Sequence, residues 1–104
     1  MSDPLKIQQG SATALNITAA TLIKGASSNA LAVGPVGRLV RINVTVAGSA
    51  VGSANDAATV ATAATANQVF VIPNTVGSYL VDVPCFSGIV VTPGTGQTVA
   101  VIYD

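Results

Sequence analysis

The side chains able to do acid–base, nucleophilic or metal chemistry are scarce in this sequence. Only 8% of its 104 residues are charged, and it has one cysteine, no histidine and no glutamate. Cys85 would need a neighbouring base to become a nucleophile, and no histidine is present to act as one. The same absence excludes a Ser–His–Asp triad and removes the commonest zinc ligand. We therefore expect Cys85 to pack as a small hydrophobic side chain.

Two other patterns could suggest a binding site. Asp56, beside Asn55, could supply oxygen ligands to calcium, but we favour an Asx turn or a helix cap. The sequence Gly94-Thr95-Gly96 lacks the lysine–serine ending of a phosphate loop and precedes a strand pattern, so it predicts a turn. The spacing of the four aspartates, Asp3, Asp56, Asp82 and Asp104, predicts no catalytic pair. We expect no catalytic residue, no metal, no cofactor and no enzymatic activity.

The four cations are scattered along the chain: Lys6, Lys24, Arg38 and Arg41. They cannot form the basic stripe that phosphate binding needs, so we expect no nucleic-acid partner. Arg38 and Arg41 lie on one predicted strand, where an exposed ion pair with Asp82 or Asp56 would contribute up to about 1 kcal/mol. Equally, the two arginines could face a partner subunit, since arginine is enriched at interfaces. The sequence leaves both possibilities open.

Strand patterns must position these residues. Arg38 to Val46 has period two and predicts a core face made of Val40, Ile42, Val44 and Val46. Gly77 to Val83 predicts a second strand of this kind, with Tyr79, Val81 and Val83 on one face. Gln68 to Ile72 is apolar on both faces, so it predicts a central strand that is covered on both sides. Shorter strand patterns occur at Ala14–Thr18, Thr21–Lys24 and Ala30–Val33.

The end of the chain, Gly88 to Asp104, predicts a hairpin. Gly88–Thr92 is followed by the turn sequence Pro93–Gly96, and Gln97–Tyr103 then alternates. Val99, Val101 and Tyr103 would share one face of its second strand. Because an uncovered strand edge is a liability in a chain with so little charge, we expect this last strand to be central or covered by a neighbouring subunit.

The middle of the chain is ambiguous. Ala47–Ser53 predicts a flexible stretch, and Asn55–Ala66 could form an alanine-rich helix capped by Asn55 or Asp56, or a strand and a loop. The predicted strands on both sides favour the strand and loop. In total, seven to eight short strands predict an all-β fold, an antiparallel β-sandwich or a jelly-roll-like barrel. We expect a flexible N-terminal arm (residues 1–12) and a single β-sandwich domain (residues 13–104).

The composition indicates a subunit of an assembly. The chain is 50% hydrophobic but only 4% aromatic, and its formal net charge is zero. Globular proteins usually have about 25% charged residues, which help to keep monomers apart. Alanine and valine bury little apolar area each, so an isolated subunit would be only marginally stable. We therefore expect a homo-oligomer. With no export signal and no apolar run long enough to span a bilayer, we expect synthesis in a cytoplasm and no membrane partner.

Short strand segments with proline and glycine punctuation recur along the chain after Thr18: GRLVRINV (37–44), DA (56–57), VIPNT (71–75), VPC (83–85) and SGIVVTPGTG (87–96). This set resembles small structural proteins encoded among the virion genes of tailed bacteriophages. The resemblance implies an all-β head decoration, cement or head-fibre protein, often trimeric, without catalytic residues. It implies a virion location after assembly in the host bacterial cytoplasm. The implied partners are other copies, in a trimer, and the major capsid protein or other virion subunits.

An alternative is a receptor- or carbohydrate-binding β-domain of a phage tail or fibre. Sugar sites usually present exposed aromatic side chains. The chain has only four, of which we expect two to be buried: Phe70, Tyr79, Phe86 and Tyr103. Under the structural hypothesis, the residues that we expect at a partner interface are Arg38, Arg41, Lys6 and Tyr103.

Overall fold

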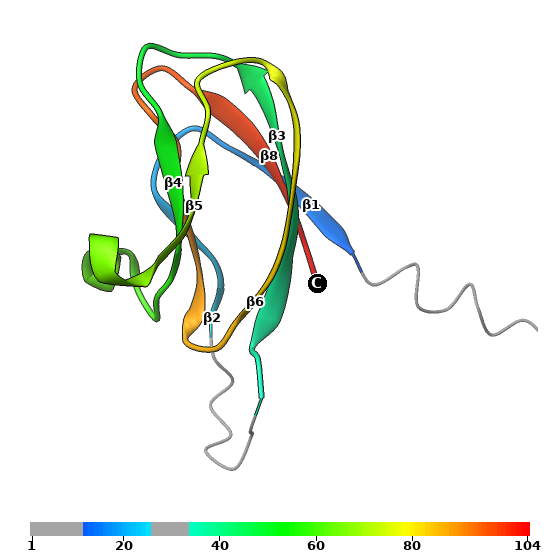
Figure 1. Cartoon of the computed structure of the whole chain (residues 1–104), viewed down its shortest axis with the longest axis vertical. Coiled ribbons are helices and arrows are strands. Elements are labelled where there is room, and N and C mark those ends of the chain that lie inside the picture. The colour runs from blue at the N-terminus through cyan, green and yellow to red at the C-terminus, as the bar shows by residue number, and fades with distance from the viewer. Residues whose placement is uncertain (1–11, 26–33) are drawn as a thin grey trace, which may run out of the picture.

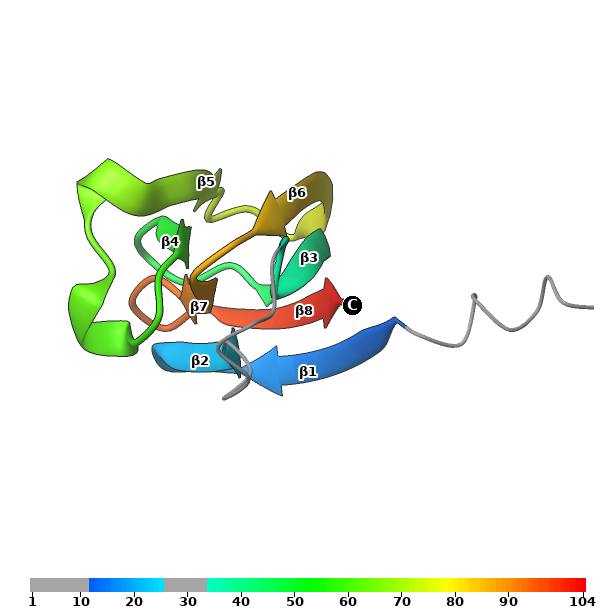
Figure 2. The ribbon, with the colours of Figure 1, turned by 90° about the horizontal axis from the view of Figure 1, so that it is seen from below.

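The computed structural model describes residues 12–25 and 34–104, which form two packed antiparallel sheets of four strands each (Figures 1 and 2). Sheet I has the order β1-β8-β3-β6, and its strands are Thr13–Ile17, Thr98–Tyr103, Gly37–Val46 and Gly77–Cys85. Sheet II has the order β2-β7-β4-β5, and its strands are Thr21–Gly25, Gly88–Thr92, Gly52–Asp56 and Gln68–Ile72. The predicted all-β sandwich is confirmed.

The strand order is that of a jelly roll. The first strand pairs with the last, β2 with β7, β3 with β6 and β4 with β5, as in one long hairpin that is rolled up. The pairs β3–β8 and β4–β7 then complete the two sheets. Every connection in the described part of the chain joins the two sheets, except the one between β4 and β5.

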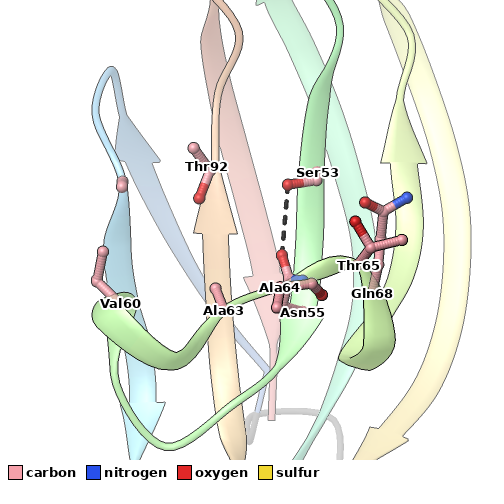
Figure 3. A pocket seen from close by; sticks show the side chains of 9 residues that line it. Ser53, Asn55, Val60, Ala63, Ala64, Thr65, Gln68 and Thr92 are labelled. Atoms are coloured by element: carbon pink, nitrogen blue, oxygen red, sulfur yellow. Dashed lines mark hydrogen bonds between the residues drawn. The ribbon is translucent and has the colours of Figure 1, made fainter.

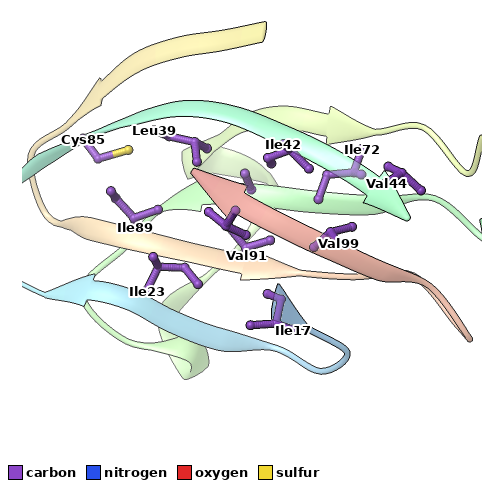
Figure 4. Packing of buried hydrophobic residues seen from close by; sticks show 12 residues of the cluster. Ile17, Ile23, Leu39, Ile42, Val44, Ile72, Cys85, Ile89, Val91 and Val99 are labelled. Carbon is purple, nitrogen blue, oxygen red and sulfur yellow. The ribbon is translucent and has the colours of Figure 1, made fainter. Parts of the chain in front are cut away.

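The core lies between the sheets and consists mostly of β-branched side chains (Figure 4). The fully buried set includes residues of β3, β7 and β8, among them Leu39, Ile42, Ile89, Val91, Val99 and Val101. Val99 and Val101, which the sequence placed on one face, both point inward, and Cys85 is buried as predicted. Tyr79, Val81 and Tyr103 pack against this core and are partly buried.

A bulge changes the predicted core face of β3. Ile42 and Val44 are buried as expected, but Leu39 takes the inward position that we assigned to Val40. The register against β6 shifts between Leu39 and Arg41, and this irregularity moves the alternation by one residue. Val46, at the end of the strand, is 51% exposed, so its predicted place in the core was wrong.

The predicted terminal hairpin is also wrong, although both strands and the turn are where the sequence placed them. β7 belongs to sheet II and β8 to sheet I, so the Pro93–Gln97 connection crosses the end of the sandwich. Within it, the Gln97 amide donates to the Gly94 carbonyl (2.9 Å), and Gly96 has a φ of 74°. β8 lies between β1 and β3, which confirms that the last strand is central.

The strand at Gln68–Ile72 is an edge strand of sheet II, not a central one, and its Val71 is 48% exposed. The strand that is covered on both sides is β7, whose residues Gly88 to Val91 are all buried. The covering segment on the outer side of sheet II is the β4–β5 connection (Figure 2). It contains two short 3-10 turns, η1 (Val60–Thr62) and η2 (Thr65–Asn67), so the strand-and-loop prediction holds here.

Three other predictions need comment. β4 begins at Gly52, inside the stretch that we expected to be flexible, because Gly52 to Ala54 pair with β5. The predicted strand Ala30–Val33 lies outside the described residues. So does the predicted arm (residues 1–12), apart from Ala12. No helix in the described ranges has the length and apolar character needed to span a bilayer.

Candidate functional site

The Asp56 carboxylate closes the turn between β6 and β7. It accepts hydrogen bonds from the backbone amides of Phe86 (3.0 Å), Ser87 (2.7 Å) and Gly88 (3.3 Å). Asp56 ends β4, so the contact joins segments that are 30 residues or more apart in the sequence. The predicted Asx turn or cap would bond its own neighbours, whereas this carboxylate anchors a distant turn. The role of Asp56 is therefore structural.

Cys85 lies at the end of β6 with its side chain in the core. Burial raises the pKa of its thiol from the ordinary 9.0 to about 11, and the negative charge of Asp56 adds to this shift. A thiol with a raised pKa is a poor nucleophile at neutral pH. Within the described residues, no cluster of three or more His, Cys, Asp or Glu side chains could hold a metal ion.

Arg38 forms one of the two predicted ion pairs. Its guanidinium lies 2.9 Å from the Asp82 carboxylate, and both side chains are largely exposed. Asp82 has a φ of 52°, in the left-handed region where aspartate is better tolerated than most residues. The bulge between β3 and β6 thus presents the acidic side chain to the arginine of the neighbouring strand.

The two arginines lie on the outer face of sheet I. Because paired residues of an antiparallel sheet share a face, the register defines two rows across this face. One row is Ala14, Ile102, Arg41 and Leu80, and the other is Asn16, Ala100, Asn43 and Ser78. Arg41 donates to the Ser78 hydroxyl (2.8 Å). Leu80 is 64% exposed, and no segment within the described ranges crosses these rows (Figure 2).

Of the residues that we expected at a partner interface, the structure brings together only Arg38 and Arg41. Tyr103 pairs with Leu39, faces inward and packs against the core, so it does not join them. Lys6 lies outside the described residues. In the middle of the outer face, Asn43 Oδ1 is buried and accepts no hydrogen bond from the described part of the chain. Buried polar atoms of this kind are usually satisfied by a bound water.

A pocket of about 390 Å³ lies on the opposite side of the molecule, between sheet II and the β4–β5 connection (Figure 3). Its polar lining comes from β4, η2, β5 and β7: Ser53, Asn55, Thr65, Gln68 and Thr92. Its apolar lining consists of Ala20, Val60, Ala63 and Ala64. None of these nine side chains is charged. We did not predict this site, because isolated Ser and Thr on the outward positions of strands give no signal that separates a pocket from ordinary solvated surface.

Asn55 fixes the pocket's inner wall. Its side-chain amide donates to the Ala64 carbonyl (2.8 Å) and to Asn67 Oδ1 (2.9 Å). Its own oxygen lies 3.3 Å from the Ser53 hydroxyl, which donates to it (Figure 3). Asn55 is only 3% exposed, although it lies on the outer side of sheet II. It therefore clamps the covering segment onto the sheet and holds the pocket in shape.

The chain matches no protein-family model, and no curated protein or solved structure matches it.

Proposed function

We propose that the protein is a non-enzymatic structural subunit of a virion, a capsid decoration or cement protein. In this proposal it associates with further copies, as a trimer, and binds the major capsid protein or other virion subunits. The virion assignment rests on the resemblance of the strand segments and their punctuation to phage structural proteins. The jelly-roll fold is compatible with it, since viral capsid domains use this architecture, but a fold alone does not assign a function.

The observation that carries the proposal is the difference between the two outer faces. The β4–β5 connection covers much of sheet II, whereas within the described ranges the two rows on sheet I are bare and include Leu80 at 64% exposure. A second copy suits this face because the net charge is zero and two copies do not repel each other. Arg38 is already neutralised by Asp82. Arg41 bonds only the neutral Ser78 hydroxyl within the described residues, so the contact must give it an acceptor on the other copy or leave it at the solvated edge.

Light scattering coupled to size exclusion, over a range of protein concentrations, tests the association. We expect the wild type to elute as an oligomer and Leu80→Lys to elute as a monomer, because a lysine on each copy puts unpaired charges into the contact. Val51→Lys is the matched control, since Val51 is 55% exposed but lies in the β3–β4 connection, away from the two rows. A wild type that stays monomeric at the highest concentration would contradict the proposal.

The virion assignment needs its own measurement. Quantitative mass spectrometry of particles purified from cells that make the protein should detect it at many copies per particle. Its absence from such particles would refute the virion role while leaving the association intact.

A further inference from the structure

The pocket on sheet II has more hydrogen-bonding capacity than the protein uses. Within the described ranges, the hydroxyls of Thr65 and Thr92 and the side-chain amide of Gln68 have no hydrogen-bond partner. Asn55, in contrast, uses both amide hydrogens on the covering segment. The pocket thus combines a fixed inner wall with unpaired donors and acceptors around it.

These groups come from separate elements and face one space. Thr92 and Ser53 are directly paired across β7 and β4, so their hydroxyls lie side by side on the sheet (Figure 3). Thr65 comes from η2 and Gln68 from the start of β5, and Figure 3 shows them together on the other side of the pocket. A ligand between them would meet polar groups on two sides. It would also meet the apolar surface of Val60 and Ala63.

We propose that this pocket binds a neutral saccharide. Hydroxyl and carboxamide groups both donate and accept, as the hydroxyls of a sugar do, and the small apolar patch suits the C–H face of a sugar ring. A charged ligand would lose its hydration without meeting an opposite charge, because the lining has none. The volume of about 390 Å³ lies within the usual range of ligand pockets, about 300–1,000 Å³.

The expected affinity of a single site is weak. The lining has no aromatic side chain on which a sugar ring could stack, so hydrogen bonds and a few alkyl contacts must supply the affinity. We expect millimolar dissociation constants. The inference does not depend on self-association, although an oligomer would carry several copies of the pocket and gain avidity for a polymeric glycan.

Titration of the ¹⁵N-labelled protein with neutral sugars tests the proposal. The panel is the methyl glycosides of glucose, galactose, mannose and N-acetylglucosamine, with glucuronate as the charged counterpart. We expect at least one neutral sugar to cause saturable amide shifts in β4, η2 and the start of β5, with little shift in sheet I. Glucuronate should bind more weakly than glucose.

Two variants distinguish binding in the pocket from weak, unspecific contact of the sugar with the protein surface. Thr92→Val keeps the shape of the side chain and removes its hydroxyl. Gln68→Met likewise removes the carboxamide of Gln68, which is exposed and bonds no other group within the described ranges. Each should raise the dissociation constant about 2- to 10-fold, as expected for the loss of one neutral hydrogen bond. Thr45→Val, on an exposed position of β3 in sheet I, should leave it unchanged.

Three results would overturn the inference. They are a panel without saturable shifts at the pocket, equal affinity in wild type, Thr92→Val and Gln68→Met, and tighter binding of glucuronate than of glucose. The oligomeric state, measured on the same samples, is independent of all three.

Discussion

Asp56 holds three consecutive backbone amides of the β6–β7 turn with one carboxylate. Hydrogen bonds to a charged acceptor contribute about 1.5–3 kcal/mol each, but water can replace part of this at an exposed turn. We predict that Asp56→Ala lowers the free energy of unfolding by about 2–3 kcal/mol. Asp56→Asn keeps one acceptor oxygen and should cost less. Urea denaturation measures both, and an unchanged midpoint for Asp56→Ala would show that the turn does not need this anchor.

Cys85 makes stability depend on alkaline pH. Because its pKa is raised from 9.0 to about 11 in the folded protein, mainly by burial, the unfolded chain loses the thiol proton first as the pH rises. The stabilising effect of the protonated thiol is complete below pH 9.0 and is lost as the pH rises to about 11. We predict that the free energy of unfolding falls more steeply across this window in the wild type than in Cys85→Ala.

Chemical denaturation at several pH values measures the two slopes. Other groups that titrate in this window are the same in both proteins, so the difference in slope isolates the thiol. Parallel slopes would contradict a buried, protonated Cys85. The stability that the variant loses through a small cavity is the same at each pH, so it does not affect the comparison of slopes.

For single residues, the sequence was informative in two situations. In one, a residue type that a chemistry needs is absent from the chain, and in the other, the local strand pattern fixes where a side chain lies. The lack of histidine favoured a Cys85 that packs in the core, where it lies, and the strand patterns put Arg38 within reach of Asp82 or Asp56, of which the pair with Asp82 forms. The role of Asp56 could not be predicted, because its partners follow it by 30 residues or more. The pocket could not be predicted either, since it exists only where β7, β4 and β5 lie beside η2.

At the scale of elements, the connection between β7 and β8 shows why strand positions were easier to predict than strand pairing. The sequence Pro93–Gly96 fits a hairpin turn and a sheet-to-sheet crossing equally well. In the structure the crossing is held by one local and one distant contact of Gln97, which is 1% exposed. Its side chain accepts from the Gly94 amide (2.9 Å) and donates to the Pro73 carbonyl (2.9 Å) of the β5–β6 turn.

The two glycines of this connection make a matched pair. A Cβ on Gly94 would overlap the backbone carbonyl of Ala50, and backbone cannot move aside as a side chain can. A Cβ on Gly96 would have its nearest neighbour at 3.7 Å, so only its φ of 74° opposes a side chain. We predict that Gly96→Ala costs about 1 kcal/mol, and that Gly94→Ala costs several times as much or prevents folding.

Thermal unfolding followed by circular dichroism compares the two variants with the wild type. Similar melting temperatures for Gly94→Ala and Gly96→Ala would mean that the β3–β4 connection does not pack against this crossing as described. The comparison also tests the topology, because a terminal hairpin within one sheet would not bring Gly94 against Ala50.

At the scale of the whole molecule, the fold class followed from the number and spacing of strand patterns, whereas the asymmetry of the two faces did not. Six of the eight strands of the described part have only five or six residues, and the core between the sheets is rich in valine and isoleucine and poor in aromatic residues. A small core of this kind supplies limited hydrophobic stabilisation. If copies associate through the outer face of sheet I, burial of Leu80 and Ile102 adds to the stability of each subunit.

This coupling predicts a melting temperature that depends on protein concentration. Association favours the folded state by mass action, so the melting temperature of the wild type should rise as the concentration rises. In Leu80→Lys the rise should disappear, and in Val51→Lys it should persist, because only the first change lies on the outer face of sheet I. Differential scanning calorimetry over a wide concentration range measures the three proteins. If Leu80→Lys and the wild type show the same dependence, the contact lies elsewhere on the molecule, with the uncharged edge strands β1 and β5 as the next surfaces to substitute.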